Sequence, residues 1–327
     1  MMKLALIGLG AWGKNYLSTV SQMHTCQITH ICARTKKTLS RFSDRYKKTS
    51  RYQDLFNEKN IDGVVIATPA ITHFQIATDF IKKGIPVLIE KPVVVSYREA
   101  QKLGQISKIT KSAIMAGYLY LYNSAFQTIV PFYTKIGRIR YVNSEGCDYG
   151  PFRSDVSVLW DWLSHDISMC LRFFMSEPEK VFAWGIPSLN INKNNHFDMI
   201  FIRFLFPGSI PVFIKIGSLS PIKKRTFMVI GTKASVVFDD TYKDKVQMIK
   251  HPKFHWGTSD DPNKNIVISK LRTSQTTPLE YEVSEFIRRI KDKDNITDTA
   301  DIVRITKIIE STEKSLLTGK MVLLKKV

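Results

Sequence analysis

Leu4-Ala-Leu-Ile-Gly8-Leu-Gly10-Ala11-Trp12-Gly13-Lys14 stands near the start of the chain and decides its fold. The apolar run is too short for a helix, a glycine turn ends it, and the residues after the turn can form a helix. In the spacing G-x-G-x-x-G, the first glycine permits a tight turn, the second lets the backbone approach a pyrophosphate, and the third lets the helix pack closely on the strand. The stretch therefore predicts a dinucleotide site at a helix N-terminus, formed by Gly8, Gly10, Ala11, Trp12 and Gly13.

Two other interpretations compete with this site. A glycine turn can exist without a ligand, and Met1-Met2-Lys3 before an apolar run resembles the start of a signal peptide. Three glycines and Lys14 interrupt that run and no small-x-small cleavage site follows, which disfavours the signal peptide. A second strand-like run, 27–33, follows at the distance that a βαβ unit needs, which favours the dinucleotide site. We expect a soluble, cytoplasmic protein.

Strand-like and helix-like segments alternate through the first part of the chain. Further strands are predicted at 61–67, 86–89 and 113–116, and helices at 38–48, 72–81 (capped by Thr72) and 96–110. This alternation predicts an α/β fold with a doubly wound parallel sheet over 1–119. Ligands bind such sheets at the carboxyl ends of the strands, where the expected cofactor contacts are Arg34, Thr35, Thr68, Pro69, His73, Glu90 and Lys91.

The end of the second strand bears on the choice of cofactor. A carboxylate there binds the ribose 2′-hydroxyl of NAD, but this chain has Ala33-Arg34-Thr35. Arg34 suits the 2′-phosphate of NADP, so the sequence favours NADP, with NAD as the alternative.

From about residue 120 the pattern changes to strand-like runs separated by the turn residues of hairpins. They predict a second domain over 120–327, used for substrate binding and oligomerisation, with a mainly antiparallel open sheet. Residues 198–206 are apolar on both faces apart from Arg203, so we expect helices on one side of the sheet and a second subunit on the other. A helix is predicted at 124–135, a long loop or hairpin at 251–277, and two closing helices, about 278–318, that pack back. The expected strands are 140–146, 181–185, 198–206, 212–217, 226–230 and 235–239.

Composition excludes several classes of protein. No apolar run is long enough to span a membrane. The net charge of +19 arises from scattered lysine doublets without interleaved aromatic residues, which indicates solvated faces and no nucleic-acid site. Four scattered cysteines indicate reduced thiols. His24, Cys26, His30 and Cys32 share one strand face, but ligands in a line do not suit tetrahedral zinc, so buried packing is favoured and no metal is expected.

Three residues could carry chemistry. Asp161 and His165 are four apart and share a helix face, and a carboxylate neighbour can adjust a histidine for proton transfer. The alternative is that Asp161 caps the helix and His165 is a core residue. Lys91 lies between a carboxylate and a proline at the ligand edge of the sheet, where burial and an oxidised nicotinamide would make it a usable base. A surface lysine is the alternative.

The whole chain resembles the Gfo/Idh/MocA oxidoreductase family. The resemblance rests on Gly8-x-Gly10-x-x-Gly13, Ala67-Thr68-Pro69-x-x-x-His73, Glu90-Lys91-Pro92, Asp161-x-x-x-His165 and Ser315-Leu-Leu-Thr-Gly-Lys-Met-Val. The stretches 117–123, 152–161 and 165–168 are most similar to the branch that oxidises nucleotide-sugar uronates at the 3-position, as UDP-N-acetylglucosaminuronate 3-dehydrogenases do in polysaccharide biosynthesis. Tyr118 and Ala33 depart from that branch, which often has histidine and an acidic residue there.

The resemblance implies a Rossmann domain, hydride transfer between a sugar hydroxyl and NAD(P), and a homodimer or homotetramer. It makes Lys91 the active-site lysine, often followed by a cis bond to Pro92, and His165 and Asp161 the acid/base and orienting pair. Substrate-facing residues would be Lys91, Tyr122, Asn123, Arg153, Asp161 and His165. The alternatives are another sugar or inositol dehydrogenase, a keto-sugar reductase, and a non-catalytic dinucleotide-binding regulator.

Overall fold

The computed structural model describes residues 1–150, 156–192, 195–250, 266–292 and 298–324. The chain divides into two compact units. Unit 1 comprises Met1–Leu119 and Thr276–Lys307, and unit 2 comprises Tyr120–Gln275 and Ile308–Val327. In the described part, no helix combines the length and the hydropathy that crossing a bilayer requires.

Unit 1 is built on a six-stranded sheet with the order β3-β2-β1-β4-β5-β6. Every neighbouring pair is parallel, which confirms the predicted doubly wound sheet. The central strands are fully buried, because parallel strands covered on both faces need apolar residues at every position. The strands are β1 (Met2–Ile7), β2 (Cys26–Cys32), β3 (Lys47–Thr49), β4 (Gly63–Ile66), β5 (Val87–Glu90) and β6 (Ile114–Gly117).

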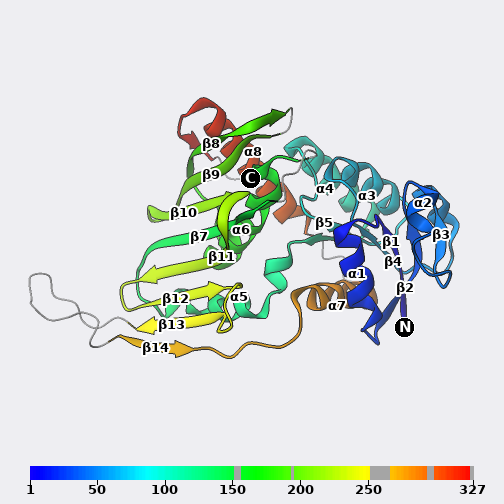
Figure 1. Cartoon of the computed structure of the whole chain (residues 1–327), viewed down its shortest axis with the longest axis horizontal. Helices are drawn as coiled ribbons and strands as arrows, with labels where there is room; N and C mark the ends of the chain where they lie inside the picture. The colour runs from blue at the N-terminus through cyan, green and yellow to red at the C-terminus, as the bar shows by residue number, and fades with distance from the viewer. Residues whose placement is uncertain (151–155, 193–194, 251–265, 293–297, 325–327) are drawn as a thin grey trace, which may run out of the picture. The chain divides into compact units, whose positions relative to one another are not determined.

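Helix α7 of unit 1 buries one apolar stripe. In α7 the stripe is Leu279, Val283, Phe286 and Ile287, spaced to share one helix face. A Cβ added at Gly63 would lie 2.8 Å from Ile290, so α7 packs directly on β4. In Figure 1, α1 lies beside α7, and α3 beside α4, in agreement with the contacts. The helices are α1 (Ala11–Ser21), α2 (Lys36–Leu39), α3 (His73–Ile81), α4 (Tyr97–Thr110) and α7 (Pro278–Lys291), with 3-10 turns at Tyr52–Asn57 and Ala70–Thr72. Helix α8 (Thr299–Thr318) begins in unit 1, and its residues from Ile308 on belong to unit 2.

Two local predictions in unit 1 are wrong. The helix expected at 38–48 is only the short α2, and β3 follows it. Ser43 accepts a hydrogen bond from the Arg45 amide (3.3 Å), which offers the backbone a turn instead of a helix. Thr72 precedes α3 as predicted, but its hydroxyl donates to the Pro69 carbonyl (2.7 Å) and does not cap the helix.

Unit 2 contains a nine-stranded sheet with the order β14-β13-β12-β11-β7-β10-β9-β8-β15. Its pairs are antiparallel except β7 with β10, which confirms the mainly antiparallel sheet. The strands are β7 (Ile139–Tyr149), β8 (Lys180–Asn192), β9 (Asn195–Phe206), β10 (Ile210–Gly217), β11 (Leu219–Gly231), β12 (Ala234–Asp239), β13 (Val246–Lys250), β14 (Val267–Lys270) and β15 (Val322–Leu323). The segment 251–277 lies mostly outside the described residues, but β14 within it pairs with β13 as one side of a hairpin.

One face of this sheet is covered by α6 (Val158–Phe174), which packs on β9 and β10 (Figure 1). The predicted helix at 124–135 is α5 (Ser124–Ile129) followed by a 3-10 segment, Val130–Thr134, because Pro131 lacks the amide that an α-helix needs there. Leu119–Tyr122 forms another short 3-10 turn. The opposite sheet face carries Trp184 and Phe213, which are 49% and 41% exposed.

Candidate active site

The glycine turn after β1 has the geometry that its spacing predicts. Gly8 has a φ of +100°, and a Cβ there would lie 2.3 Å from the Ala67 carbonyl oxygen. A Cβ at Gly13 would lie 2.0 Å from the Gly8 carbonyl oxygen. A side chain is therefore excluded at both positions, which lets α1 start directly against the strand ends.

The start of α1 is open to an anion. A Cβ at Gly10 would meet no described atom within 4 Å. Gly10 precedes the helix, and no side chain among the described residues caps its first amides. Ala11 is exposed, Trp12 is half-buried and the first turn carries no acidic residue. The free amides and the helix dipole therefore favour a phosphate at this position.

The end of β2 is basic. Arg34 is exposed, and Thr35 begins α2 by accepting a hydrogen bond from the Thr38 amide (3.2 Å). Lys36 and Lys37 follow, so the segment presents cations and no carboxylate.

His73 joins two of the predicted cofactor segments. Its Nε2 lies 2.8 Å from the Thr68 carbonyl oxygen after β4, and its Nδ1 lies 2.9 Å from the Pro92 carbonyl oxygen after β5. The hydroxyls of Thr68 and Thr72 are hydrogen-bonded at 2.7 Å. His73 is 1% exposed, so in this structure it ties the two segments together from within the protein.

Lys91 is half-buried immediately after β5, next to a cis peptide bond to Pro92. Its amide donates to the Glu90 carboxylate (3.1 Å), and Glu90 is buried. The cis bond that the family resemblance implies is therefore present, and Lys91 lies at the same sheet edge as the glycine turn.

A buried acidic group beneath this edge was not predicted. The Tyr16 hydroxyl of α1 donates to Glu282 of α7 (2.8 Å), and Glu282 is 1% exposed. Burial first, and then the charge of Glu90, raise the pKa of Glu282 well above its ordinary value. The sequence signal was available, because Glu282 falls within the apolar stripe of α7, where an acidic residue is unusual.

Asp161 and His165 lie on α6 in unit 2. Both are buried, at 9% and 8% exposure, and their four-residue spacing places them on one helix face. The alternative role of Asp161 as the helix cap is wrong, because Ser157 accepts the capping hydrogen bond from the Trp160 amide (3.4 Å).

The other predicted substrate residues have different surroundings. Asn123 is buried, its side-chain oxygen accepts from the Ala125 amide (2.9 Å) and its side-chain nitrogen donates to Asp240 (3.2 Å). Tyr122 is half-buried beside it in sequence. Arg153 lies outside the described residues.

Next to His165 the structure adds a cluster that sequence analysis missed. Tyr120 contacts His165 edge to face, with ring centroids 5.0 Å apart, and the Arg225 guanidinium lies 4.1 Å from the centre of the Tyr120 ring. Arg225 also donates to Asp166 (3.0 Å). No local pattern could have shown this, because Arg225 and Asp166 are 59 residues apart in the chain.

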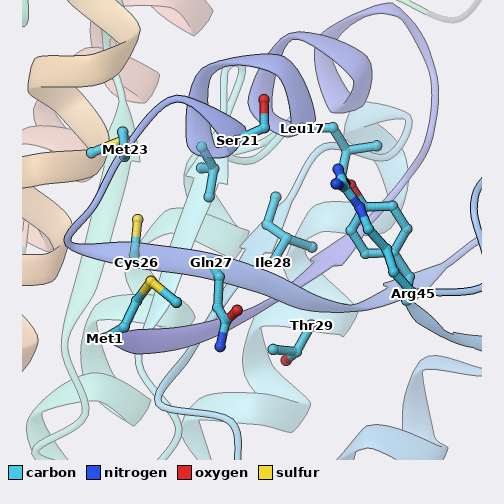
Figure 2. A pocket seen from close by; sticks show the side chains of 11 residues that line it. Met1, Leu17, Ser21, Met23, Cys26, Gln27, Ile28, Thr29 and Arg45 are labelled. Atoms are coloured by element: carbon cyan, nitrogen blue, oxygen red, sulfur yellow. Dashed lines mark hydrogen bonds between the residues drawn. The ribbon is translucent and has the colours of Figure 1, made fainter.

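A cavity of about 320 Å³ occurs elsewhere in unit 1 (Figure 2). Met1 and Cys26, at the amino ends of β1 and β2, line it together with Leu17 of α1. It therefore lies away from the carboxyl ends of the strands, where the glycine turn is. In the segments that the structure describes, no three His, Cys, Asp or Glu side chains converge on a metal position.

A parallel sheet with this glycine turn and an open helix N-terminus defines a dinucleotide-binding domain of the Rossmann type. Residues 2–118 match the model of the Gfo/Idh/MocA oxidoreductase family, described as having an NAD-binding Rossmann fold. The first third of the chain is therefore similar to the NAD-binding Rossmann domain of that oxidoreductase family.

Curated relatives match little more than a third of the chain. The rhizopine catabolism protein MocA of Rhizobium meliloti is 28% identical over 119 residues, which cover 36% of this chain and 37% of that protein. The UDP-N-acetylglucosamine 3-dehydrogenase of Acidithiobacillus ferrooxidans is 28% identical over 130 residues, which cover 39% of this chain and 41% of that protein. The chain thus aligns with less than half the length of these relatives.

Solved structures resemble the chain over nearly its whole length. A putative oxidoreductase from Magnetospirillum magnetotacticum superimposes with a TM-score of 0.81 at 25% identity, covering 94% of this chain and 98% of that one. The UDP-N-acetylglucosamine 3-dehydrogenase GnnA from Acidithiobacillus ferrooxidans superimposes with a TM-score of 0.83 at 18% identity, covering 97% of this chain and 98% of that one. The two-sheet fold is therefore shared with this group of oxidoreductases.

Proposed function

We propose that this protein is an NAD(P)-dependent oxidoreductase that transfers a hydride between a sugar hydroxyl and the nicotinamide. The observation that carries the proposal is the joint presence of an open helix N-terminus after the glycine turn and of Lys91 at the same edge of the sheet. The preferred substrate is a nucleotide-linked sugar or uronate, oxidised at the 3-position. The relative that is a UDP-N-acetylglucosamine 3-dehydrogenase supports this substrate class.

The predicted domain 1–119 would bind the dinucleotide, and the predicted domain 120–327 would bind the sugar. The nicotinamide supplies the redox chemistry when it is bound. The residues proposed to hold it are Gly8, Gly10, Ala11, Trp12, Gly13, Arg34, Thr35, Thr68, Pro69, His73, Glu90 and Lys91. Of these, His73 acts by holding the backbone of two cofactor segments, since both of its ring nitrogens contact carbonyl oxygens.

The proton of the sugar hydroxyl needs an acceptor. Lys91 is the first candidate, because it is half-buried at the sheet edge that carries the glycine turn, and burial favours the neutral amine that can accept a proton. His165 is the second acid/base group, and Asp161 on the same helix face would orient it. Tyr122, Asn123 and Arg153 are proposed to face the substrate.

NADP is the proposed cofactor, with NAD as the alternative. The exposed Arg34 and the lysines after it offer cations to a 2′-phosphate. A carboxylate that would repel this phosphate is missing from 33–37. We further propose a cytoplasmic location, because all four cysteines are free thiols.

A direct test is the change in nicotinamide absorbance when the protein, with NADP or NAD in turn, is mixed with nucleotide-sugar uronates, nucleotide sugars, free sugars and inositols. Reduction of the cofactor by one uronate would support the proposed reaction, cofactor and substrate class together. Reduction only with an inositol would favour the inositol dehydrogenases, one of which, from Salmonella paratyphi B, is 24% identical over 131 residues. Dinucleotide binding without turnover on any member would favour a non-catalytic regulator.

Replacing Gly10 by alanine tests the cofactor site. The new Cβ meets no described atom within 4 Å, so the melting temperature is expected to stay unchanged. The methyl group would stand where the pyrophosphate approaches the backbone, so dinucleotide affinity is expected to fall about tenfold or more. Titration of cofactor fluorescence measures the affinity. Gly84→Ala is the control: its Cβ also meets open space, yet its φ of +73° should lower stability and not affinity. Unchanged affinity in Gly10→Ala would remove this turn from the cofactor site.

We also propose that a second copy of this chain covers the open face of the unit 2 sheet. Trp184 stacks on Phe201 with ring centroids 5.5 Å apart, and both rings project from the face that α6 does not cover. Trp184→Glu is expected to convert a dimer or tetramer into a smaller species, because it places a charge in an apolar interface. Sedimentation equilibrium measures the mass, and a wild-type monomer would contradict the proposal.

A further inference from the structure

We propose that Arg225 and Tyr120 position His165, by a stack of the guanidinium on the tyrosine ring that fixes the plane of the imidazole. This inference rests on the proposed function, which assigns proton transfer to His165. It concerns residues from three separate elements: Arg225 from β11, Tyr120 from the turn before α5, and His165 from α6.

The guanidinium is held at its far side by a buried ion pair. Arg225 is 3% exposed and Asp166 is fully buried. The Arg225 Nη1 donates to Asp166 Oδ2 at 3.0 Å, and the Ser144 hydroxyl of β7 donates to Asp166 Oδ1 at 2.5 Å. A carboxylate with both oxygens engaged has a fixed plane, so the guanidinium that it binds has a fixed position too.

The near side of the guanidinium faces an aromatic ring. Its carbon lies 4.1 Å from the centre of Tyr120, within the range of a cation–π contact. Arg225 Nε and Nη2 have no hydrogen-bond partner of good geometry among the described residues. Burial raises the pKa of Tyr120, which keeps the ring neutral, so the contact is a stack on a phenol and not an ion pair.

Tyr120 transmits this position to the imidazole. Its ring meets His165 at an interplanar angle of 87° with centroids 5.0 Å apart, the edge-to-face arrangement that aromatic pairs prefer. The ring of Phe238 of β12 also packs against Tyr120, with ring centroids 6.2 Å apart. The ring is therefore held on several sides, and a shift of the guanidinium would free it to rotate against His165.

A glycine on the neighbouring strand leaves room for the Arg225 guanidinium. Gly146 of β7 is the register partner of Arg225 on β11. A Cβ at Gly146 would lie 2.3 Å from Arg225 Nη1 and 3.4 Å from Asp166 Oδ2. Because Nη1 is the end of a side chain, Gly146→Ala should displace the guanidinium without a shift of the sheet backbone, at a smaller cost in stability than removal of the arginine.

Four variants separate the ring, the hydroxyl and the cation. Gly146→Ala moves the guanidinium, Tyr120→Leu removes the ring, Tyr120→Phe keeps the ring without its hydroxyl, and Arg225→Lys keeps the charge but loses the planar stack. Arg140→Lys, an exposed arginine on β7, is the matched control. Melting temperature and cofactor affinity are measured for each variant, so that unfolding can be distinguished from a change in the orientation of the His165 ring.

The first readout is kinetic. Gly146→Ala, Tyr120→Leu and Arg225→Lys are expected to lower kcat about tenfold to a hundredfold, while cofactor affinity and the KM for the sugar change little. Tyr120→Phe and Arg140→Lys are expected to keep kcat. Unchanged kcat in folded Gly146→Ala and Tyr120→Leu would overturn the positioning role.

The second readout does not need a known substrate. The ring-proton NMR signals of His165, assigned by their loss in His165→Asn, are expected to shift or broaden in Gly146→Ala and Tyr120→Leu and to stay in place in Tyr120→Phe. Signals that are the same in all variants would overturn the inference even if the enzyme is active. If no sugar is turned over by the wild type while the signals move as expected, the proposed function fails and the contact that orients His165 stands.

Discussion

Lys91→Ala is expected to lower turnover by about 10² to 10⁴-fold, the range that a positioned acid or base contributes. Lys91 is the proposed acceptor of the hydroxyl proton, and alanine leaves no group to replace it. Dinucleotide affinity should change little, since the glycine turn and the open start of α1 remain. Lys91→Arg should also lose most turnover, because a guanidinium keeps the charge but does not release its proton.

The measurement is kcat under saturating cofactor, with affinity titrated separately. Lys83→Ala is the matched control, since Lys83 is exposed after α3, and it should behave as the wild type. Normal turnover in Lys91→Ala would remove Lys91 from the mechanism and leave His165 as the base.

Arg225→Ala is expected to destabilise the protein by about 3–5 kcal/mol, the usual cost of leaving a buried charge without its partner. Asp166 would remain fully buried, and within the described parts of the chain the Ser144 hydroxyl would be its one remaining side-chain donor. Urea unfolding, followed by the fluorescence of the tryptophans of unit 2, measures the loss.

A surface ion pair provides the control for this prediction. Arg304 and Asp301 pair at 3.2 Å, with side chains that are 44% and 50% exposed. Arg304→Ala should cost at most about 1 kcal/mol, because solvent screens exposed pairs. The double variant Asp166→Asn/Arg225→Met removes both buried charges and should regain part of the stability that Arg225→Ala loses. Equal losses for Arg225→Ala and Arg304→Ala would contradict the role given to burial.

The sheet of unit 1 could be predicted because its signals are local. The glycine spacing and the alternation of apolar runs with helical segments define β1, β2, β4, β5 and β6 without knowledge of distant contacts. β3 was missed because Lys47–Thr49 is three residues long and largely polar, and only its pairing with β2 makes it a strand. β13, 246–250, also obtains its strand conformation from its neighbours, β12 and β14.

The residues of the candidate site also differ in whether a local sequence signal predicts them. Lys91, Asp161 and His165 belong to short motifs, so sequence alone could name them. Arg225 and Tyr120 could not be named, because their contact joins a strand to a turn more than a hundred residues earlier and depends on the glycine opposite Arg225. Such residues carry no spacing signal, and only the folded sheet brings them together.

The raised pKa of the buried Glu282 has a consequence for proton linkage. Its pKa in the folded protein is raised above the ordinary value of 4.5, so between these two values the folded chain holds a proton that the unfolded chain has released. The stability that this carboxyl permits is fully present below pH 4.5 and is lost as the pH rises through the raised value. Glu282→Gln, which is neutral at every pH, should lack this loss in a series of thermal melts from acidic to alkaline buffer. Parallel curves for the two proteins would show that Glu282 is ionised in the folded state. If the loss is present, folding takes up a proton from solution, and an alkaline shift alone would loosen the packing of α1 against α7 beneath the sheet edge that carries Lys91.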